Sequence, residues 1–179
     1  MTARQFTKVS ILILVASLLL IVGVAGAAGD KVTHFTGMEY LPSLAECEAA
    51  GGWMSGDHCV LAETPPTITP DGKHLEAWHI SYWRDESTDP RYMGYTTVDA
   101  HLFLNLSTGH ARIWGTWRHD VDRPPDSGWV EGTGWEGTWN VSSAGFLVAR
   151  AQGTGSFEGM ILHTKQFLGT GAIEGTIIE

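Results

Sequence analysis

Two histidines and one carboxylate stand at positions from which a β-strand could direct them into an enclosed cavity. His119 and His163 each follow a glycine by four residues, and each lies two residues after a large apolar side chain. Because side chains alternate between the faces of a strand, we expect each histidine to share the face of that apolar residue. A neutral imidazole in a lumen can serve as a hydrogen-bond partner or general base, whereas a histidine at the rim would only contact water. Glu131, on the face expected for Trp135, is a further candidate with less support.

Three tryptophans could supply a binding site of another kind. Trp117, Trp135 and Trp139 all fall on the face that these segments are expected to turn inward. Small barrels either fill their interior with side chains or hold one small ligand. The tryptophans therefore either form a packed core or line a lumen that takes an apolar or aromatic molecule.

A repeated five-residue pattern indicates the elements that would position these side chains. Each copy contains an apolar residue, any residue, glycine, any residue and a second apolar residue, which is the alternation of a strand rather than a helix. A glycine between two large inward side chains allows a neighbouring chain to approach closely or a sheet to bend. The copies are 113–117, 135–139, 157–161 and 173–177.

Turn residues divide the C-terminal part of the chain into short segments, which favours an antiparallel meander. We expect seven strands from Lys73 onward, and Val32 to Phe35 could add an eighth that closes a barrel. The fold class predicted is thus all-β, an antiparallel eight-stranded meander barrel with a small N-terminal lobe. The seven strands are expected at about 74–84, 92–106, 110–119, 129–140, 146–152, 156–166 and 170–178.

The N-terminus has the three regions of a secretory signal peptide: basic residues, an apolar run and a small-residue cleavage site. We expect cleavage after Ala27, giving a protein that is secreted or otherwise extracytoplasmic and has no stable membrane span. A retained transmembrane anchor at residues 9–28 is the alternative. Residues 28–72 are expected to form a cystine lobe and a Pro-rich linker, and residues 73–179 the barrel domain.

The two cysteines of the chain, Cys47 and Cys59, predict a disulfide, because exported proteins meet an oxidising compartment. Ser43 and Glu46 have the spacing of a capping box, which predicts a short helix that carries Cys47. The disulfide would then join this helix to the returning segment. We expect no metal site here, because a pair of cysteines with one adjacent histidine lacks the ligand set of zinc.

Charge and missing motifs exclude several classes of function. The net charge of −9 would fall to −11 on removal of residues 1–27, and such a surface repels nucleic acid. No phosphate loop, dinucleotide fingerprint or nucleophile elbow occurs, and we expect no cofactor. Glu136, Glu158 and Glu174 lie beside the repeat glycines, on the face expected to be solvated.

The segment Gly153 to Met160, with the sequence GTGSFEGM, resembles the Gly-Thr-Gly-x-Phe-x-Gly segment of the allene oxide cyclase and dirigent-like barrel families and of related exported bacterial barrels. Residues 112–117 and 134–139 also resemble strands of those bacterial proteins. The resemblance covers residues 92–179 and implies an eight-stranded barrel with a central cavity. In the named enzymes the cavity guides cyclisation or radical coupling without a cofactor, but their active-site residues find no match in this chain.

Three functions remain open from the sequence. The first is an exported barrel that binds a small apolar or aromatic molecule in its lumen. The second is a cofactor-free cyclase or isomerase, which would need inward ionisable groups that face one another. The third is a cell-envelope interaction module with a filled barrel.

Overall fold

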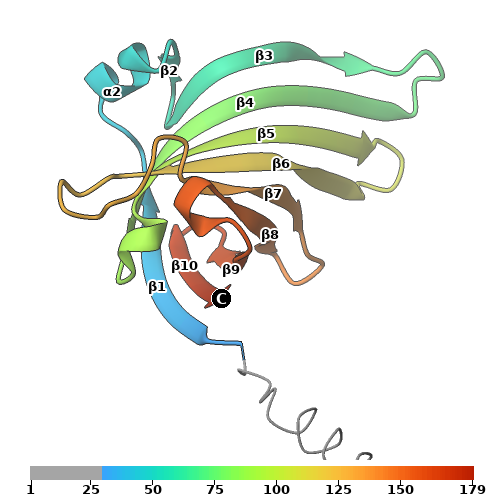
Figure 1. Ribbon diagram of the computed structural model, residues 1–179. Helices are drawn as coiled ribbons and strands as arrows, with labels where there is room; N and C mark the ends of the chain where they lie inside the picture. Colours follow the sequence, from blue (N-terminus) through green and yellow to red (C-terminus); the bar gives the residue numbers. More distant parts are fainter. Residues whose placement is uncertain (1–29) are drawn as a thin grey trace, which may run out of the picture. The chain divides into compact units, whose positions relative to one another are not determined.

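The computed structural model describes residues 30–179, so the expected signal peptide at residues 1–27 and the alternative anchor at residues 9–28 both lie outside the described residues. Residues 32–179 form one compact unit. Ten antiparallel strands form a single sheet, and eight of them close into a ring (Figure 1), which confirms the predicted all-β barrel. The strands are β1 (Val32–Tyr40), β2 (Trp53–Ser55), β3 (His58–Ile68), β4 (His74–Ser87), β5 (Gly94–Asn105), β6 (Ala111–Val121), β7 (Gly134–Val141), β8 (Phe146–Thr154), β9 (Ile161–Phe167) and β10 (Ala172–Ile178).

β4 has two partners on the same edge, and this arrangement both closes the ring and extends the sheet beyond it. From β4 to β10 each strand pairs with the next in sequence, and β10 pairs with β1. Residues 84–87 of β4 then pair with β1, whereas residues 75–82 pair with β3. The ring is therefore closed by a short seam of four residue pairs, and β2 and β3 continue the sheet outside it.

The proline-rich segment expected to be a linker is largely strand, and that prediction was wrong. Residues 64–68 belong to β3, which pairs with β4 up to Ile68. The register shifts between Thr64 and Thr67, where Pro65 and Pro66 have no backbone N–H to donate. An outer strand tolerates proline because its free edge needs no ladder. The cystine region is consequently joined to the barrel by the sheet rather than separated from it.

The predicted disulfide and helix cap are both present in the N-terminal region. Helix α2 (Leu44–Ala49) begins after Ser43, whose backbone N–H donates to the Glu46 carboxylate at 2.7 Å, while Ser43 Oγ accepts from the Glu46 N–H at 3.3 Å. Cys47 on this helix is bonded to Cys59 at the start of β3, and both are fully buried. The disulfide therefore fixes α2 against the sheet.

Three of the four repeat copies form strands as predicted, within β6, β7 and β10. In these copies glycine allows the close approach of neighbouring chains. A Cβ at Gly115 would lie 1.7 Å from the backbone oxygen of Asp99, and one at Gly137 would lie 2.0 Å from that of Arg150. Any larger residue at either position would force adjacent strands apart.

The fourth copy, residues 157–161, is not a strand. It begins at the end of the 3-10 helix η2 (Gly155–Phe157) and continues through a turn in which Gly159 has a φ of +91°. A Cβ at Gly159 would meet nothing within 4 Å, so the prediction that this glycine lies between two inward side chains was wrong. The turn also shifts the alternation that follows, so that Leu162 and Thr164 point inward in β9 instead of their odd-numbered neighbours.

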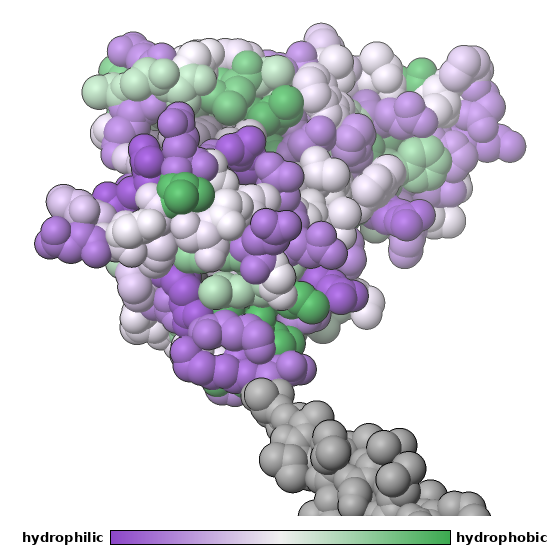
Figure 2. Space-filling view, in the orientation of Figure 1, coloured by the Kyte–Doolittle hydropathy of each residue, from purple (hydrophilic) through white to green (hydrophobic). Residues whose placement is uncertain are grey.

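The surface seen in Figure 2 is mostly hydrophilic, with separate hydrophobic patches. Among the exposed apolar side chains are Leu41, Leu44 and Trp53, which belong to the region of α2 and β2. The 3-10 helix η1 (Pro90–Tyr92), between β4 and β5, places Tyr92 in the core.

Candidate functional site

One end of the barrel opens into a pocket of about 580 Å³. Its lining is mainly apolar: inward residues of β5 to β8 form an apolar wall, and β4 adds His79, Ser81 and Trp83. The turn between β2 and β3 supplies Asp57 and His58 to the pocket, and the turn between β9 and β10 supplies residues 168–171. The apolar wall consists of Val98, Ala100, Ile113, Trp139, Val141 and Leu147.

Trp139 forms a fixed part of this wall. Its indole Nε1 donates to the backbone oxygens of Thr116 at 3.1 Å and Asp99 at 3.2 Å. A Cβ at Gly115 would lie only 3.0 Å from that nitrogen, so the glycine makes room for the indole. The repeat glycine thus positions an aromatic ring beside the pocket.

Glu39 borders both this pocket and a small void of about 20 Å³ beneath it. Gln166 Nε2 donates to its carboxylate, and Asp85 lies directly opposite it across the β1–β4 seam. Burial and the charge of Asp85 raise the pKa of Glu39 to about 8, against the opposing effect of the Gln166 hydrogen bond. Near neutral pH the carboxyl is therefore mostly protonated and can donate a hydrogen bond.

Beside Glu39, three buried polar residues from three strands form a hydrogen-bonded cluster. Thr96 Oγ1 donates to Asp85 Oδ2, and His119 Nδ1 lies 2.8 Å from Thr96 Oγ1 and 3.2 Å from Asp85 Oδ2. The ring of Tyr92 stacks on His119 at 4.6 Å with an interplanar angle of 2°. Burial, with the charges of Asp85 and Glu39, raises the pKa of Tyr92 well above its ordinary value. The phenol consequently stays neutral.

Two atoms of this cluster, His119 Nε2 and Asp85 Oδ1, have no hydrogen-bond partner among the described residues. Buried polar atoms are usually paired, so the cluster retains unused capacity for a donor or acceptor. His119 points inward as the alternation predicts, but it borders neither the pocket nor the void.

The opposite end of the barrel is filled. Trp135 is fully buried, its ring centroid lies 5.2 Å from that of Phe157 in η2, and its Nε1 donates to the backbone oxygen of Arg91 in η1 at 2.6 Å. Trp117 borders the small void, and its Nε1 has no partner in the described part of the chain. Of the three predicted tryptophans, Trp139 alone lines the open pocket.

Two other predicted lumen residues lie elsewhere. His163 is exposed, because η2 and the turn after it shift the alternation of β9 by one residue. Glu131 is also exposed, because it lies in a turn before β7, where Gly132 has a φ of +76°. Sequence reasoning missed Glu39, although Phe35, Gly37 and Glu39 continue the inward alternation of β1.

Within residues 30–179, no helix is long and apolar enough to cross a membrane, and no three His, Cys, Asp or Glu side chains are grouped to hold a metal ion. The exposed carboxylates Glu136, Glu158 and Glu174 lie on the solvated side, as predicted. Comparison of the chain with protein-family models, curated proteins and solved structures finds no match. The resemblance of residues 92–179 to the allene oxide cyclase and dirigent-like barrels therefore stays a prediction.

Proposed function

We propose that the protein is exported and binds one small apolar or aromatic molecule in the pocket at the open end of the barrel. The observation that carries this proposal is a concave, mainly apolar pocket of about 580 Å³, with Glu39 and Gln166 at its base and further polar side chains, such as His79 and Ser81, in its lining. Small-molecule sites commonly enclose about 300–1,000 Å³ and have this composition. The Cys47–Cys59 disulfide supports export, because disulfides persist in oxidising compartments.

The polar groups at the base give the ligand an orientation. Glu39 and Gln166 lie together where the pocket meets the small void, and Trp139 lies on the adjoining wall. A molecule with an apolar body and one carbonyl or hydroxyl group fits this arrangement. Its body would pack against Trp139, and its oxygen would accept a hydrogen bond from the protonated Glu39 carboxyl.

Titration with the neutral fluorescent probe N-phenyl-1-naphthylamine tests the proposal. We expect saturable binding with one site per chain, detected by probe fluorescence and by a change in tryptophan emission. Trp139→Ala should weaken binding by removing stacking area, and Trp139→Phe gives the same comparison with less disturbance of the core. Trp53→Ala is the matched control, because Trp53 is 43% exposed on β2 and lines none of these cavities.

Absence of saturable binding, or equal affinity in the Trp139 and Trp53 variants, would contradict a site in this pocket. The filled-barrel interaction module would then be the better account, supported by the tightly packed opposite end.

A cofactor-free cyclase or isomerase is a second candidate, favoured by one observation. Three inward ionisable groups follow one another from the pocket into the core: Glu39 borders the pocket, Asp85 lies opposite Glu39, and His119 Nδ1 lies 3.2 Å from Asp85 Oδ2. Glu39 as carboxylate could remove a proton from carbon next to a ligand carbonyl, and the resulting enolate would regain that proton at carbon from the Glu39 carboxyl. The resemblance to barrels that guide cyclisation supports the same class of reaction.

Exchange of deuterium into 2-tetralone in D₂O tests this second candidate. We expect the wild type to accelerate exchange at the carbon next to the carbonyl, with the rate rising as Glu39 ionises around pH 8. Glu39→Gln should reduce exchange to the background rate while the variant still binds the naphthylamine probe. If both proteins exchange equally, Glu39 is not the base, and the binding function alone remains.

A further inference from the structure

A row of aromatic side chains crosses the outer face of the sheet, away from the lumen. Trp78, His101 and Trp114 are direct register neighbours on β4, β5 and β6. The rings of His101 and Trp114 stack at 5.8 Å with an interplanar angle of 18°. All three side chains are only partly buried. Barrel exteriors in water are expected to carry polar residues at such positions, so two tryptophans together there need a cause other than folding.

Hydrogen bonds and a cation hold this aromatic row in place. Trp78 Nε1 donates to Asp99 Oδ1 at 2.7 Å, and His101 Nε2 lies 3.2 Å from the same oxygen. The guanidinium of Arg112 lies 5.1 Å from the ring centre of Trp114. Asp99 remains 34% exposed, so its carboxylate can still reach a ligand. Groups that are already ordered lose little conformational entropy when they bind.

Grooves lie on both sides of the row. One of about 590 Å³ runs beside Trp114 and contains Asp99, Arg112, Thr116 and Thr138. The other, of about 320 Å³, is lined by residues of β3 to β6, among them Thr64, Trp78 and Phe103. The first continues into a third groove of about 550 Å³, because the two share Asp99, Thr116 and Thr138.

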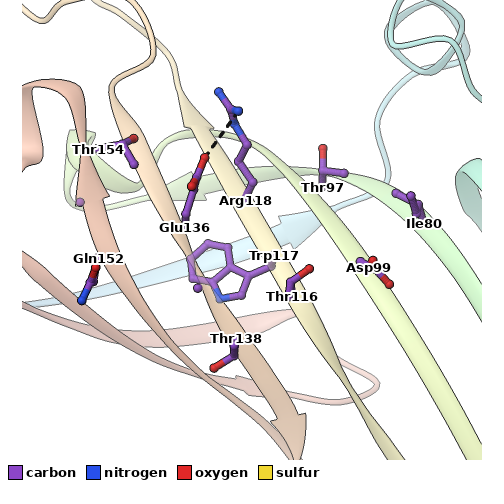
Figure 3. Close-up of a pocket in the computed structure, with 12 residues that line it drawn as sticks. Ile80, Thr97, Asp99, Thr116, Trp117, Arg118, Glu136, Thr138, Gln152 and Thr154 are labelled. Carbon is purple, nitrogen blue, oxygen red and sulfur yellow. Dashed lines mark ion pairs between the residues drawn. The ribbon is translucent and has the colours of Figure 1, made fainter.

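Hydroxyl, amide and carboxylate groups dominate the third groove. Figure 3 shows them gathered from four adjacent strands, β5 to β8, with the ion pair between Arg118 and Glu136 among them. Arg118 also lies 2.9 Å from Asp120, so two carboxylates, those of Asp120 and Glu136, counter its positive charge. The outer face therefore offers paired charges and many neutral hydrogen-bonding groups beside flat aromatic rings.

We propose that this outer face binds a neutral oligosaccharide, with sugar rings packed against Trp78 and Trp114 and sugar hydroxyls bonded to Asp99, Thr116 and Thr138. A sugar presents one apolar face of C–H groups and a rim of hydroxyls, and the aromatic row and its grooves complement both. Extended grooves suit a chain of several sugars. Anionic glycans fit poorly, because the chain carries a net charge of −9 and Arg118 is already countered by Asp120 and Glu136.

An extended peptide is the main competing occupant. Peptides commonly bind sheets by adding a strand at a free edge. The two larger grooves lie over β4 to β8, whose strands pair with neighbours on both sides, so these grooves offer no free edge; the smallest groove alone of the three reaches the outer strand β3. The face itself, with its hydroxyls and rings, favours the sugar.

Isothermal titration with cellohexaose, laminarihexaose, xylohexaose, mannohexaose and chitohexaose tests the proposal on the whole chain. We expect at least one of them to bind saturably with one site per chain. Trp114→Ala should weaken that binding about tenfold or more, equal to about 1.4 kcal/mol. Trp78→Ala should act in the same direction, and Trp53→Ala, another exposed tryptophan, should leave affinity unchanged.

Two-dimensional NMR of the wild type gives a readout that does not depend on folding of the variants. The indole N–H signals of Trp78 and Trp114 should shift on addition of the bound sugar, whereas that of Trp53 should not. The sugar and N-phenyl-1-naphthylamine should bind together without competition. No binding by any of the five sugars, equal affinity in the Trp114 and Trp53 variants, or competition with the probe would overturn the proposal. So would binding of an extended peptide such as decaserine without any of the sugars.

Discussion

Trp135 and Trp139 lie four residues apart on the same face of β7, yet they belong to opposite ends of the barrel interior. Trp135 is covered by η1 and η2, and its indole nitrogen is satisfied by the backbone of Arg91. Trp139 lies in β7 beyond the reach of those short helices and borders a pocket of about 580 Å³. The same residue type in one repeat unit therefore packs in the core at one end and borders an open pocket at the other.

The difference shows that the strand pattern does not decide which part of a lumen is open. At both ends the strands direct alternating side chains and glycines inward. At only one end, however, do segments between the strands cover the interior of the barrel. Tyr92 and Phe157, the apolar residues of those two short helices, are both buried. The pocket exists because the turns at the other end, at 56–57 and 168–171, border it without filling it.

Among the variants that test the difference between the two ends, Trp135→Ala should cause the largest loss in the free energy of unfolding. Loss of a fully buried indole should leave a cavity at the closed end and lower the free energy of unfolding by about 3–5 kcal/mol. Chemical denaturation monitored by circular dichroism measures the change. Affinity for the naphthylamine probe at the open end should change little in the folded variant. If Trp135→Ala instead abolished probe binding while the protein stayed folded, the two ends would not be independent.

Glu39→Gln tests the open end through its pH dependence. The folded protein holds the Glu39 proton up to about pH 8, whereas the unfolded chain releases it near 4.5, so the free energy of unfolding falls as pH rises between these values. The amide removes this loss while keeping a partner for Gln166. At pH 9 the variant should be more stable than the wild type by up to about 5 kcal/mol, at about 1.4 kcal/mol per pKa unit.

Thermal or denaturant unfolding at pH 5, 7 and 9 measures the Glu39 effect. The wild type should lose stability relative to the variant over this series, and most of the difference should appear by pH 8. Glu174→Gln on the exposed side of β10 is the matched control and should follow the wild type. Parallel curves for wild type and Glu39→Gln would mean that the carboxyl is not held protonated beside Asp85.

Much of the barrel could be predicted from sequence because its strands are regular. Alternation and turn residues located the strands well enough to give the fold class, and the repeat glycines at 115 and 137 indicated the close approach of neighbouring chains. The pairing of Cys47 with Cys59 was predicted from the expectation that the protein is exported. These features depend on local spacing, which a single sequence displays directly.

The remaining features depend on contacts between distant segments. The void-lining carboxyl of Glu39 becomes unusual only when β1 meets β4 and brings Asp85 opposite it. His163 was placed inward because one turn, at Gly159, could not be distinguished from a continuing strand. The proline-rich strand was taken for a linker because proline tolerance depends on whether a strand lies at an edge, which only the sheet order reveals.

Removal of the disulfide should loosen the rim of the pocket but not the packed end of the barrel, so it tests whether the two ends are independent. Cys59 is adjacent to His58 in the turn that borders the open pocket, so the double variant Cys47→Ser, Cys59→Ser should loosen that rim. We expect a loss of about 3 kcal/mol, from greater freedom of the unfolded chain. Hydrogen exchange should rise in α2, β2 and the start of β3, with weaker probe binding, while η1 and η2 keep their protection. Equal loss of protection at both ends would contradict a local role for the disulfide.

The smallest effect is expected at Gly159, in the turn after η2 that shifts the alternation of β9. Its φ of +91° is unfavourable for side chains, and a Cβ there would point into open space. Gly159→Ala should therefore cost about 1–2 kcal/mol through backbone conformation alone. Gly159→Asn should cost less than alanine despite its greater size, because asparagine tolerates positive φ better. Denaturant unfolding of both variants separates strain from crowding: if asparagine were the more destabilising, the position would face packed side chains, and the turn at the closed end would not be where the structure places it.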